Sequence, residues 1–135
     1  MPKKKILLVD DEPQTIVMVT SRLRANDYEV LAATSGPESI EFAREFNPDL
    51  ILLDIIMPAM EGYDVLLRLK TDKDLCQIPV IVLTVATRKN LEAICVKAGA
   101  KAVIFKPFNP AELLALIKKA FDPNSKWRRP ESICD

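Results

Sequence analysis

The feature that most constrains the fold is the alternation of short aliphatic runs with segments whose apolar residues recur at helical spacing. The aliphatic runs lie at residues 5–9, 28–33, 50–54, 80–84 and 102–105. Helical periodicity falls at residues 13–25, 37–46, 63–70, 91–98 and 109–120. Because neighbouring parallel strands need right-handed crossovers, this order predicts one α/β domain: a doubly wound, parallel, five-stranded sheet with helices on both faces.

Two residues near the amino terminus indicate how the first helix begins. Asp11 and Gln14 have the spacing of a helix capping box, and Pro13 suits the first turn of a helix. We therefore expect a helix from about residue 13 to residue 25, with the Asp11 side chain at its cap.

The run at residues 50–54 is the strongest candidate for the central strand. Four aliphatic residues precede Asp54, and residues with turn preference lie on both sides, as in a strand buried on both faces. Asp54 then stands at the carboxyl end, the edge of an open α/β sheet where ligands bind. Taken alone, a carboxylate there can equally do no more than solvate a turn.

Composition excludes several kinds of chemistry. The 135 residues fit one domain, and 19 basic and 19 acidic residues give a net charge of zero, so no overall basic field favours nucleic acid. The sequence has no histidine, which excludes histidine metal sites, Ser-His-Asp triads and an internal relay histidine. Cys76, Cys95 and Cys134 are odd in number and lack CxxC spacing, which argues against a disulfide framework or a zinc site.

The amino terminus lacks the features of a secretory signal. The charged start is followed by only a short apolar stretch, Ile6–Val9, whereas a signal peptide needs about seven to fifteen apolar residues. No apolar run approaches the roughly 18 residues that span a bilayer. We expect a cytoplasmic protein without membrane contact.

Polar side chains follow the first, third, fourth and fifth aliphatic runs. They are Asp10 with Asp11, then Asp54, Thr84 and Lys106. In a parallel sheet these ends share one edge, so three carboxylates, a hydroxyl and an ammonium are expected to meet there. Three carboxylates need a cation, and ligands that are all hard oxygen suit Mg²⁺.

These groups also suit phosphoryl chemistry. Asp54 is a carboxylate of the kind that forms aspartyl-phosphates, and a bound metal leaves coordination positions for a phosphoryl oxygen. Lys106 and Thr84 can pair with other phosphoryl oxygens. The alternative is a static ion pair of Lys106 with Asp10 or Asp11, without further function.

Several of these segments together resemble the receiver domain of two-component response regulators. They are Leu8–Glu12, Leu53–Pro58, Gly62, Thr84 and Lys106–Phe108. The resemblance covers residues 4 to about 121 and implies a flavodoxin-like (βα)5 fold with strand order 2-1-3-4-5. It divides the chain into a receiver domain, 1–121, and a tail or linker, 122–135.

By this resemblance, Asp54 accepts a phosphoryl group from the phosphohistidine of a sensor histidine kinase or a phosphotransfer protein. Thr84 and Lys106 engage that phosphoryl group, and Mg²⁺ is the implied cofactor. The implied metal ligands are the side chains of Asp10, Asp11 and Asp54 and the backbone carbonyl of Ile56.

The resemblance also implies an output. Phosphorylation switches the surface formed by the fourth helix, fifth strand and fifth helix, which then binds a partner or a second copy of the chain. The protein would be a signalling phosphoacceptor with at most self-catalysed phosphotransfer and autodephosphorylation, not an enzyme acting on separate substrates. Nothing in the sequence has the pattern of a DNA-binding segment, so we expect no direct binding of nucleic acid by this chain.

Two residues depart from the family pattern. Val103 stands where receivers usually carry Phe or Tyr, the ring that swings inward when the threonine moves, and Val85 follows Thr84 where a small residue is commoner. One alternative is therefore a pseudo-receiver, an interaction module that is never phosphorylated. Another is the receiver part of a larger transcriptional regulator.

Two enzyme or ligand-binding classes fit less well. A phosphatase of the haloacid dehalogenase type carries a second carboxylate two residues after its nucleophile, where this chain has Ile56. A flavodoxin-like nucleotide binder would place phosphate against Asp10–Glu12, where the negative charges repel it.

Overall fold

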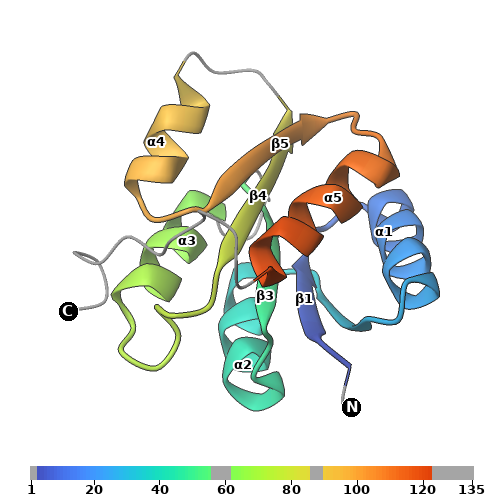
Figure 1. The fold of residues 1–135 in the computed structure, drawn as a ribbon. Helices are drawn as coiled ribbons and strands as arrows, with labels where there is room; N and C mark the ends of the chain where they lie inside the picture. Colours follow the sequence, from blue (N-terminus) through green and yellow to red (C-terminus); the bar gives the residue numbers. More distant parts are fainter. Residues whose placement is uncertain (1–2, 56–61, 86–89, 123–135) are drawn as a thin grey trace.

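The computed structural model describes residues 3–55, 62–85 and 90–122, and all structural statements below concern these residues. They form five strands: β1 (Lys5–Val9), β2 (Glu29–Ala33), β3 (Leu50–Asp54), β4 (Val80–Val85) and β5 (Ala102–Lys106). They also form five helices: α1 (Pro13–Ala25), α2 (Gly36–Phe46), α3 (Gly62–Thr71), α4 (Leu91–Lys97) and α5 (Pro110–Phe121). Strands and helices alternate along the chain (Figure 1).

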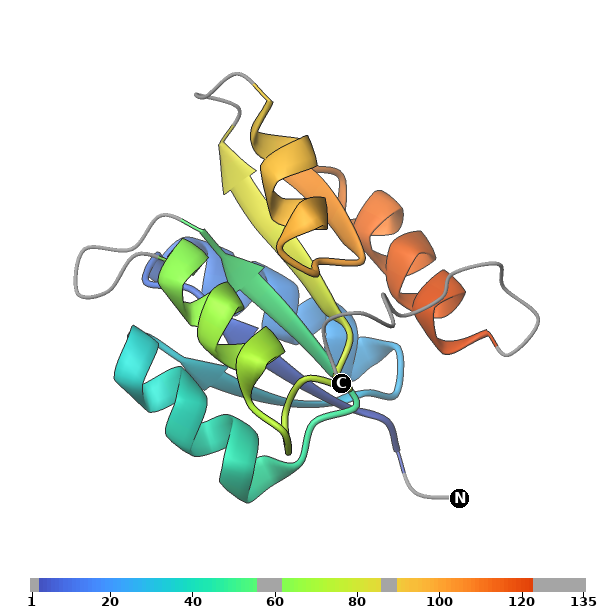
Figure 2. The same cartoon turned by 90° about the vertical axis from the view of Figure 1, so that its left-hand side faces the viewer.

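The strands make one parallel sheet in the order β2-β1-β3-β4-β5. Helices α1 and α5 lie on one face of this sheet, and α2, α3 and α4 lie on the other (Figures 1 and 2). The predicted fold class, the flavodoxin-like architecture and the strand order 2-1-3-4-5 are confirmed.

Strand alternation divides the interior into two cores. Leu7, Ile51 and Val82 pack with α2, α3 and α4, whereas their neighbours Leu8 and Leu52 pack with α1 and α5. All five residues of β3 are buried, as expected of a parallel strand covered on both faces. The central strand that carries Asp54 is therefore held rigidly from two sides.

The start of α1 differs from the prediction. The helix runs over the predicted residues, but its N-cap is Glu12, whose side chain makes no capping hydrogen bond, so the Asp11–Gln14 capping box was wrong. The Asp10 carboxylate accepts the Glu12 N–H instead, at 2.9 Å. The side chain that fixes this turn thus comes from the end of β1.

The predictions about the cysteines and about membrane-spanning segments can be compared with the described residues. Cys76 and Cys95 are buried free thiols, whereas Cys134 lies outside the described part of the chain. Among the described helices, none combines the length and apolar character required to cross a membrane.

Gly62 connects the start of α3 to the end of β3. Its N–H donates to the carbonyl oxygen of Ile55 at 2.7 Å. A Cβ at this position would lie 2.1 Å from the backbone oxygen of Asp54 and 2.4 Å from the Cα of Ile55. Because both are backbone atoms, no side-chain rotation can relieve the overlap, and a glycine is required.

We expect Gly62→Ala to lower the free energy of unfolding by about 2–3 kcal/mol, the cost of overpacking a site that cannot adjust. Urea denaturation followed by circular dichroism measures this change. Arg68→Ala, at an exposed position of the same helix, is the control and should change stability by no more than about 0.5 kcal/mol. Equal stabilities of the two variants would contradict the close approach at Gly62.

Candidate functional site

The carboxyl ends of β1, β3 and β5 bring three predicted residues together. Asp10 directly follows β1, while Asp54 and Lys106 are the last residues of β3 and β5. The ammonium nitrogen Nζ of Lys106 lies 2.9 Å from Oδ2 of Asp10 and 3.3 Å from Oδ2 of Asp54. It also lies 2.8 Å from Oε1 of Glu12, a residue to which sequence reasoning gave no role.

The pKa of Lys106 reflects this surrounding charge. Burial opposes the charged ammonium, but the hydrogen bonds to Glu12 and Asp10 and the charges of Asp10 and Asp54 outweigh burial. Together they raise the pKa of Lys106 above the ordinary lysine value. The ammonium is therefore a fixed positive charge at neutral pH.

The three carboxylates differ sharply in their access to water. The side chains of Asp10 and Asp54 are 0% and 6% exposed and that of Lys106 is 12% exposed, whereas that of Glu12 is 58% exposed. In the described ion pairs, one ammonium faces three carboxylates. Like charges about 4 Å apart repel by about 4 kcal/mol at an effective dielectric near 20. The static ion pair of Lys106 with Asp10, the alternative considered from the sequence, is present as well.

The close group of carboxylates fits a hard cation. One oxygen from each of Asp10, Glu12 and Asp54 lies within 4.8 Å of the others, so these atoms converge on a small volume. Carboxylate oxygens are the ligands of Mg²⁺, which commonly binds through few carboxylates and keeps several waters. Two of these side chains, Asp10 and Asp54, are predicted metal ligands, so this edge suits a divalent cation of that kind.

Asp11 and Ile56 complete the predicted metal ligands. Asp11 lines a cavity of about 180 Å³ together with Glu12, Asp54, Val85 and Lys106. Asp11 thus borders the same space as Asp54 without belonging to the tightest group of oxygens. Ile56, whose carbonyl was the fourth predicted ligand, lies outside the described residues.

Thr84 is buried in β4, one residue before the strand end. It pairs with Phe105 in the register with β5, next to the Val85–Lys106 pair. Its hydroxyl makes a long hydrogen bond of 3.5 Å to the carbonyl oxygen of Val85. Such a bond is weak, so the hydroxyl can exchange it for a better acceptor at little cost.

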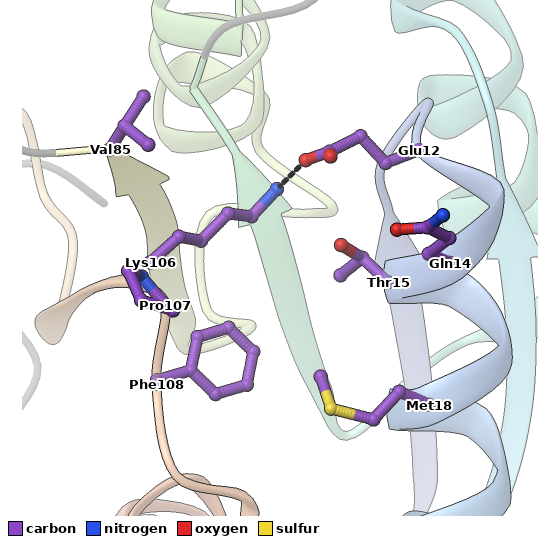
Figure 3. Close-up of a pocket in the computed structure, with 8 residues that line it drawn as sticks. All are labelled: Glu12, Gln14, Thr15, Met18, Val85, Lys106, Pro107 and Phe108. Carbon is purple, nitrogen blue, oxygen red and sulfur yellow. Dashed lines mark hydrogen bonds and ion pairs between the residues drawn. The ribbon is translucent and has the colours of Figure 1, made fainter.

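A wider cleft of about 500 Å³ adjoins this site between α1 and the segment that follows β5 (Figure 3). Apolar atoms of Met18, Pro107 and Phe108 contribute to its walls, and Gln14 and Thr15 line it from α1. The Lys106–Pro107 peptide bond in its wall is cis.

Comparison with known proteins shows which family this chain belongs to. The profile described as the response regulator receiver domain matches residues 6–118, most of the chain. The chain belongs to this family. Receiver domains of response regulators are signalling modules of two-component systems.

Two curated relatives are longer than this receiver. The DNA-binding response regulator MtrA of Mycolicibacterium smegmatis is 34% identical over 116 residues, which cover 86% of this chain and 50% of MtrA. The response regulator GtcR of Aneurinibacillus migulanus is 33% identical over 128 residues, which cover 95% of this chain and 52% of GtcR. The receiver chain thus spans about half the length of these relatives.

Solved structures of receivers superpose closely on this fold. The chemotaxis response regulator CheY4 of Vibrio cholerae gives a TM-score of 0.82 at 29% identity, covering 88% of this chain and 99% of CheY4. The CheY-like receiver domain protein of Methanospirillum hungatei gives a TM-score of 0.80 at 32% identity, covering 87% of this chain and 92% of that one.

Glu12 is the site residue that sequence reasoning missed. It follows Asp10 by two residues, and its backbone is extended, with φ −87° and ψ 113°. The chain bends at Asp11, and the side chains of Asp10 and Glu12 both reach the Lys106 ammonium. The run of three acidic residues after β1 was the available signal.

Replacing Lys106 with methionine keeps the apolar stem of this receiver residue and removes its charge. At pH 7 we expect Lys106→Met to lower the free energy of unfolding by about 3 kcal/mol, because Asp10 and Asp54 stay buried without their counter-charge. Urea denaturation in a chelating buffer measures the difference.

The pH dependence of that difference tests its cause. Because the folded-state pKa of Lys106 is raised, its contribution is fully present below the unfolded lysine pKa of about 10.4 and is lost as pH rises through the folded value. The stability difference should therefore stay constant from about pH 7 to pH 9 and shrink above about pH 10.5. If the stability difference between the wild type and Lys106→Met already shrinks below pH 9, the raised pKa of Lys106 would be contradicted.

Proposed function

We propose that this receiver accepts a phosphoryl group on Asp54, in the presence of Mg²⁺, from the phosphohistidine of a sensor histidine kinase or a phosphotransfer protein. The observation that carries the proposal is the Lys106 ammonium held between Asp10 and Asp54 at the carboxyl edge of a receiver-family sheet. The kinase supplies the histidine, because this chain has none.

The transfer is a displacement at phosphorus. An oxygen of the Asp54 carboxylate attacks the phosphorus atom, the N–P bond of the phosphohistidine breaks, and its electron pair leaves with the imidazole. Lys106 pairs with a phosphoryl oxygen and neutralises part of its charge. The domain catalyses only its own modification and, afterwards, its own dephosphorylation.

Mg²⁺ would be held by the Asp10, Asp11 and Asp54 carboxylates and the backbone carbonyl of Ile56. When bound, the ion supplies positive charge to the phosphoryl oxygens. The convergence of Asp10 and Asp54 oxygens at this edge, with Asp11 lining the same cavity, supports this assignment.

The switch would depend on Thr84. Its hydroxyl, weakly bonded to Val85, can turn to a phosphoryl oxygen and change the packing of β4 against β5 and α4. Val103 pairs with Val82 and packs with the core that α4 covers, where receivers usually place an aromatic ring. In this chain the switch would therefore use the hydroxyl without a swinging ring. The altered surface of α4, β5 and α5 then binds an output partner or a second copy.

A second candidate function is supported by the relatives. One of them is named a DNA-binding response regulator, and the chain spans about half of its length. The chain can accordingly be the receiver part of a transcriptional regulator. Residues 122–135 would then form the linker from the receiver, 1–121, to an output domain.

Intact mass spectrometry after incubation with acetyl phosphate and Mg²⁺ tests the phosphoacceptor. The wild type should gain a single phosphoryl adduct, and Asp54→Asn should gain none, because the amide is a poor nucleophile. Asp64→Asn, which changes an exposed carboxylate on α3, is the matched control and should be modified like the wild type.

A parallel incubation with chelator tests the metal requirement, and the adduct should not form there. An adduct on Asp54→Asn would move the acceptor elsewhere. No adduct on the wild type, even with a phosphorylated kinase domain as donor, would favour the pseudo-receiver.

We expect Thr84→Val to separate phosphorylation from switching, since valine keeps the side-chain shape and removes the hydroxyl. The variant should still be phosphorylated, while hydrogen exchange of α4 and β5 should not change on phosphorylation as it does in the wild type. The folded state should lose no more than about 1 kcal/mol with this poor hydrogen bond. Thr84→Ser, which retains a hydroxyl, is the control. A wild-type exchange response in Thr84→Val would contradict the role of the hydroxyl.

A further inference from the structure

We propose that Glu12 is an exchangeable partner of Lys106 that restrains phosphoryl transfer, because Lys106 must release Glu12 to hold a phosphoryl oxygen. This inference rests on the proposed function of Asp54 as phosphoacceptor. It makes Glu12 a positioning residue that acts through Lys106 and touches neither the phosphorus atom nor its donor.

The Lys106 ammonium has no spare donor in the structure. It carries three N–H groups, and three carboxylate oxygens accept from them: those of Glu12, Asp10 and Asp54, at 2.8, 2.9 and 3.3 Å. A phosphoryl oxygen that pairs with Lys106 must therefore displace one of these oxygens.

Asp10 and Asp54 are poorly placed to leave. Asp10 is fully buried, and its second oxygen accepts the backbone N–H of Glu12 at 2.9 Å. Asp54 is also buried, and as the acceptor it stays at the reacting centre. Glu12 has a side chain that is 58% exposed, so it can turn into water without leaving a buried charge unpaired.

Among the described residues, the Glu12 side chain makes no bond other than that to Lys106 that would oppose such a movement. Its backbone begins α1, with the carbonyl oxygen accepting from Ile16 N–H at 3.0 Å, while the side chain makes no capping hydrogen bond. N-cap positions favour Ser, Thr, Asp or Asn, whose side chains cap the helix, and this glutamate reaches Lys106 instead. Substitution of the side chain should therefore leave the fold intact.

The Glu12–Lys106 pair also lies where the two cavities meet. Glu12, Val85 and Lys106 line both the 180 Å³ cavity that contains Asp54 and the 500 Å³ cleft beside α1. Figure 3 shows the ion pair spanning the space between α1 and the end of β5. A donor group that enters from this cleft meets the ion pair before it meets Asp54.

Weakening the Glu12–Lys106 contact should accelerate phosphorylation. Because the ion pair must break before transfer, and one of its partners is exposed, it should slow phosphorylation by a factor of up to about five. We expect Glu12→Gln to form phospho-Asp54 about two to five times faster than the wild type at saturating acetyl phosphate and Mg²⁺.

Glu12→Asp distinguishes the effect of the Glu12–Lys106 contact from the effect of the negative charge at residue 12. It keeps the negative charge, but it is one methylene shorter and withdraws the carboxylate from Lys106. Rates are measured by intact mass over a series of acetyl phosphate concentrations for the wild type, both Glu12 variants and Asp64→Asn. Both Glu12 variants should be faster than the wild type at saturating donor, and Asp64→Asn should match it.

A second readout does not depend on activity. The ¹⁵N-detected ammonium signal of Lys106 should show faster hydrogen exchange with water in both Glu12 variants, because a neutral amide oxygen replaces the carboxylate in Glu12→Gln and the carboxylate is withdrawn in Glu12→Asp.

Different outcomes reject different claims. Adducts that form at one rate in all proteins would overturn the role of Glu12 and leave the phosphoacceptor intact. A faster Glu12→Gln beside a Glu12→Asp with wild-type rate would assign the effect to repulsion of the anionic donor and overturn the inference. The absence of any adduct would remove the proposed function and the inference together, while the ammonium signal would still report the contact.

Discussion

The site depends on a dense group of charges at the carboxyl edge of the sheet. The Lys106 ammonium faces two buried aspartates and one exposed glutamate. Such an arrangement is costly in a low-dielectric interior unless it is held rigidly and open to a further cation. The buried strands provide the rigidity. The group of carboxylates is of a kind that could hold a metal ion.

The two-core architecture explains how this edge stays in place. β3 is covered on both faces, so Asp54 can move little relative to Asp10 on β1. β5 is different, because it is an edge strand and most of its residues are only partly buried. Lys106 therefore extends from the less constrained strand toward carboxylates on the more constrained ones. Residues of the site can therefore shift position more easily on β4, β5 and α4 than on β1.

Much of the fold and part of the site could be predicted from sequence because both follow from periodicity. The parallel order places every strand end on one edge, so the meeting of Asp10, Asp54 and Lys106 needed no knowledge of side-chain packing. The choice between Asp11 and Glu12 as partner of Lys106 could not be made in this way. It depends on how the chain turns between β1 and α1, and the Asp10 hydrogen bond to the Glu12 N–H determines that turn. The close approach of Gly62 to the backbone of Asp54 likewise depends on tertiary packing.

The packing of the last helix against the first affects how the chain folds during synthesis. The first and last helices share a core, and Phe121 at the end of α5 packs against Tyr28, with their ring centroids 6.0 Å apart, while Lys4 lies over the Phe121 ring. The sheet face carrying Ile6 and Leu8 therefore stays partly uncovered during synthesis until residue 121 has left the ribosome. A nascent chain that pauses before this point exposes apolar strands. Completion of the last helix covers these strands.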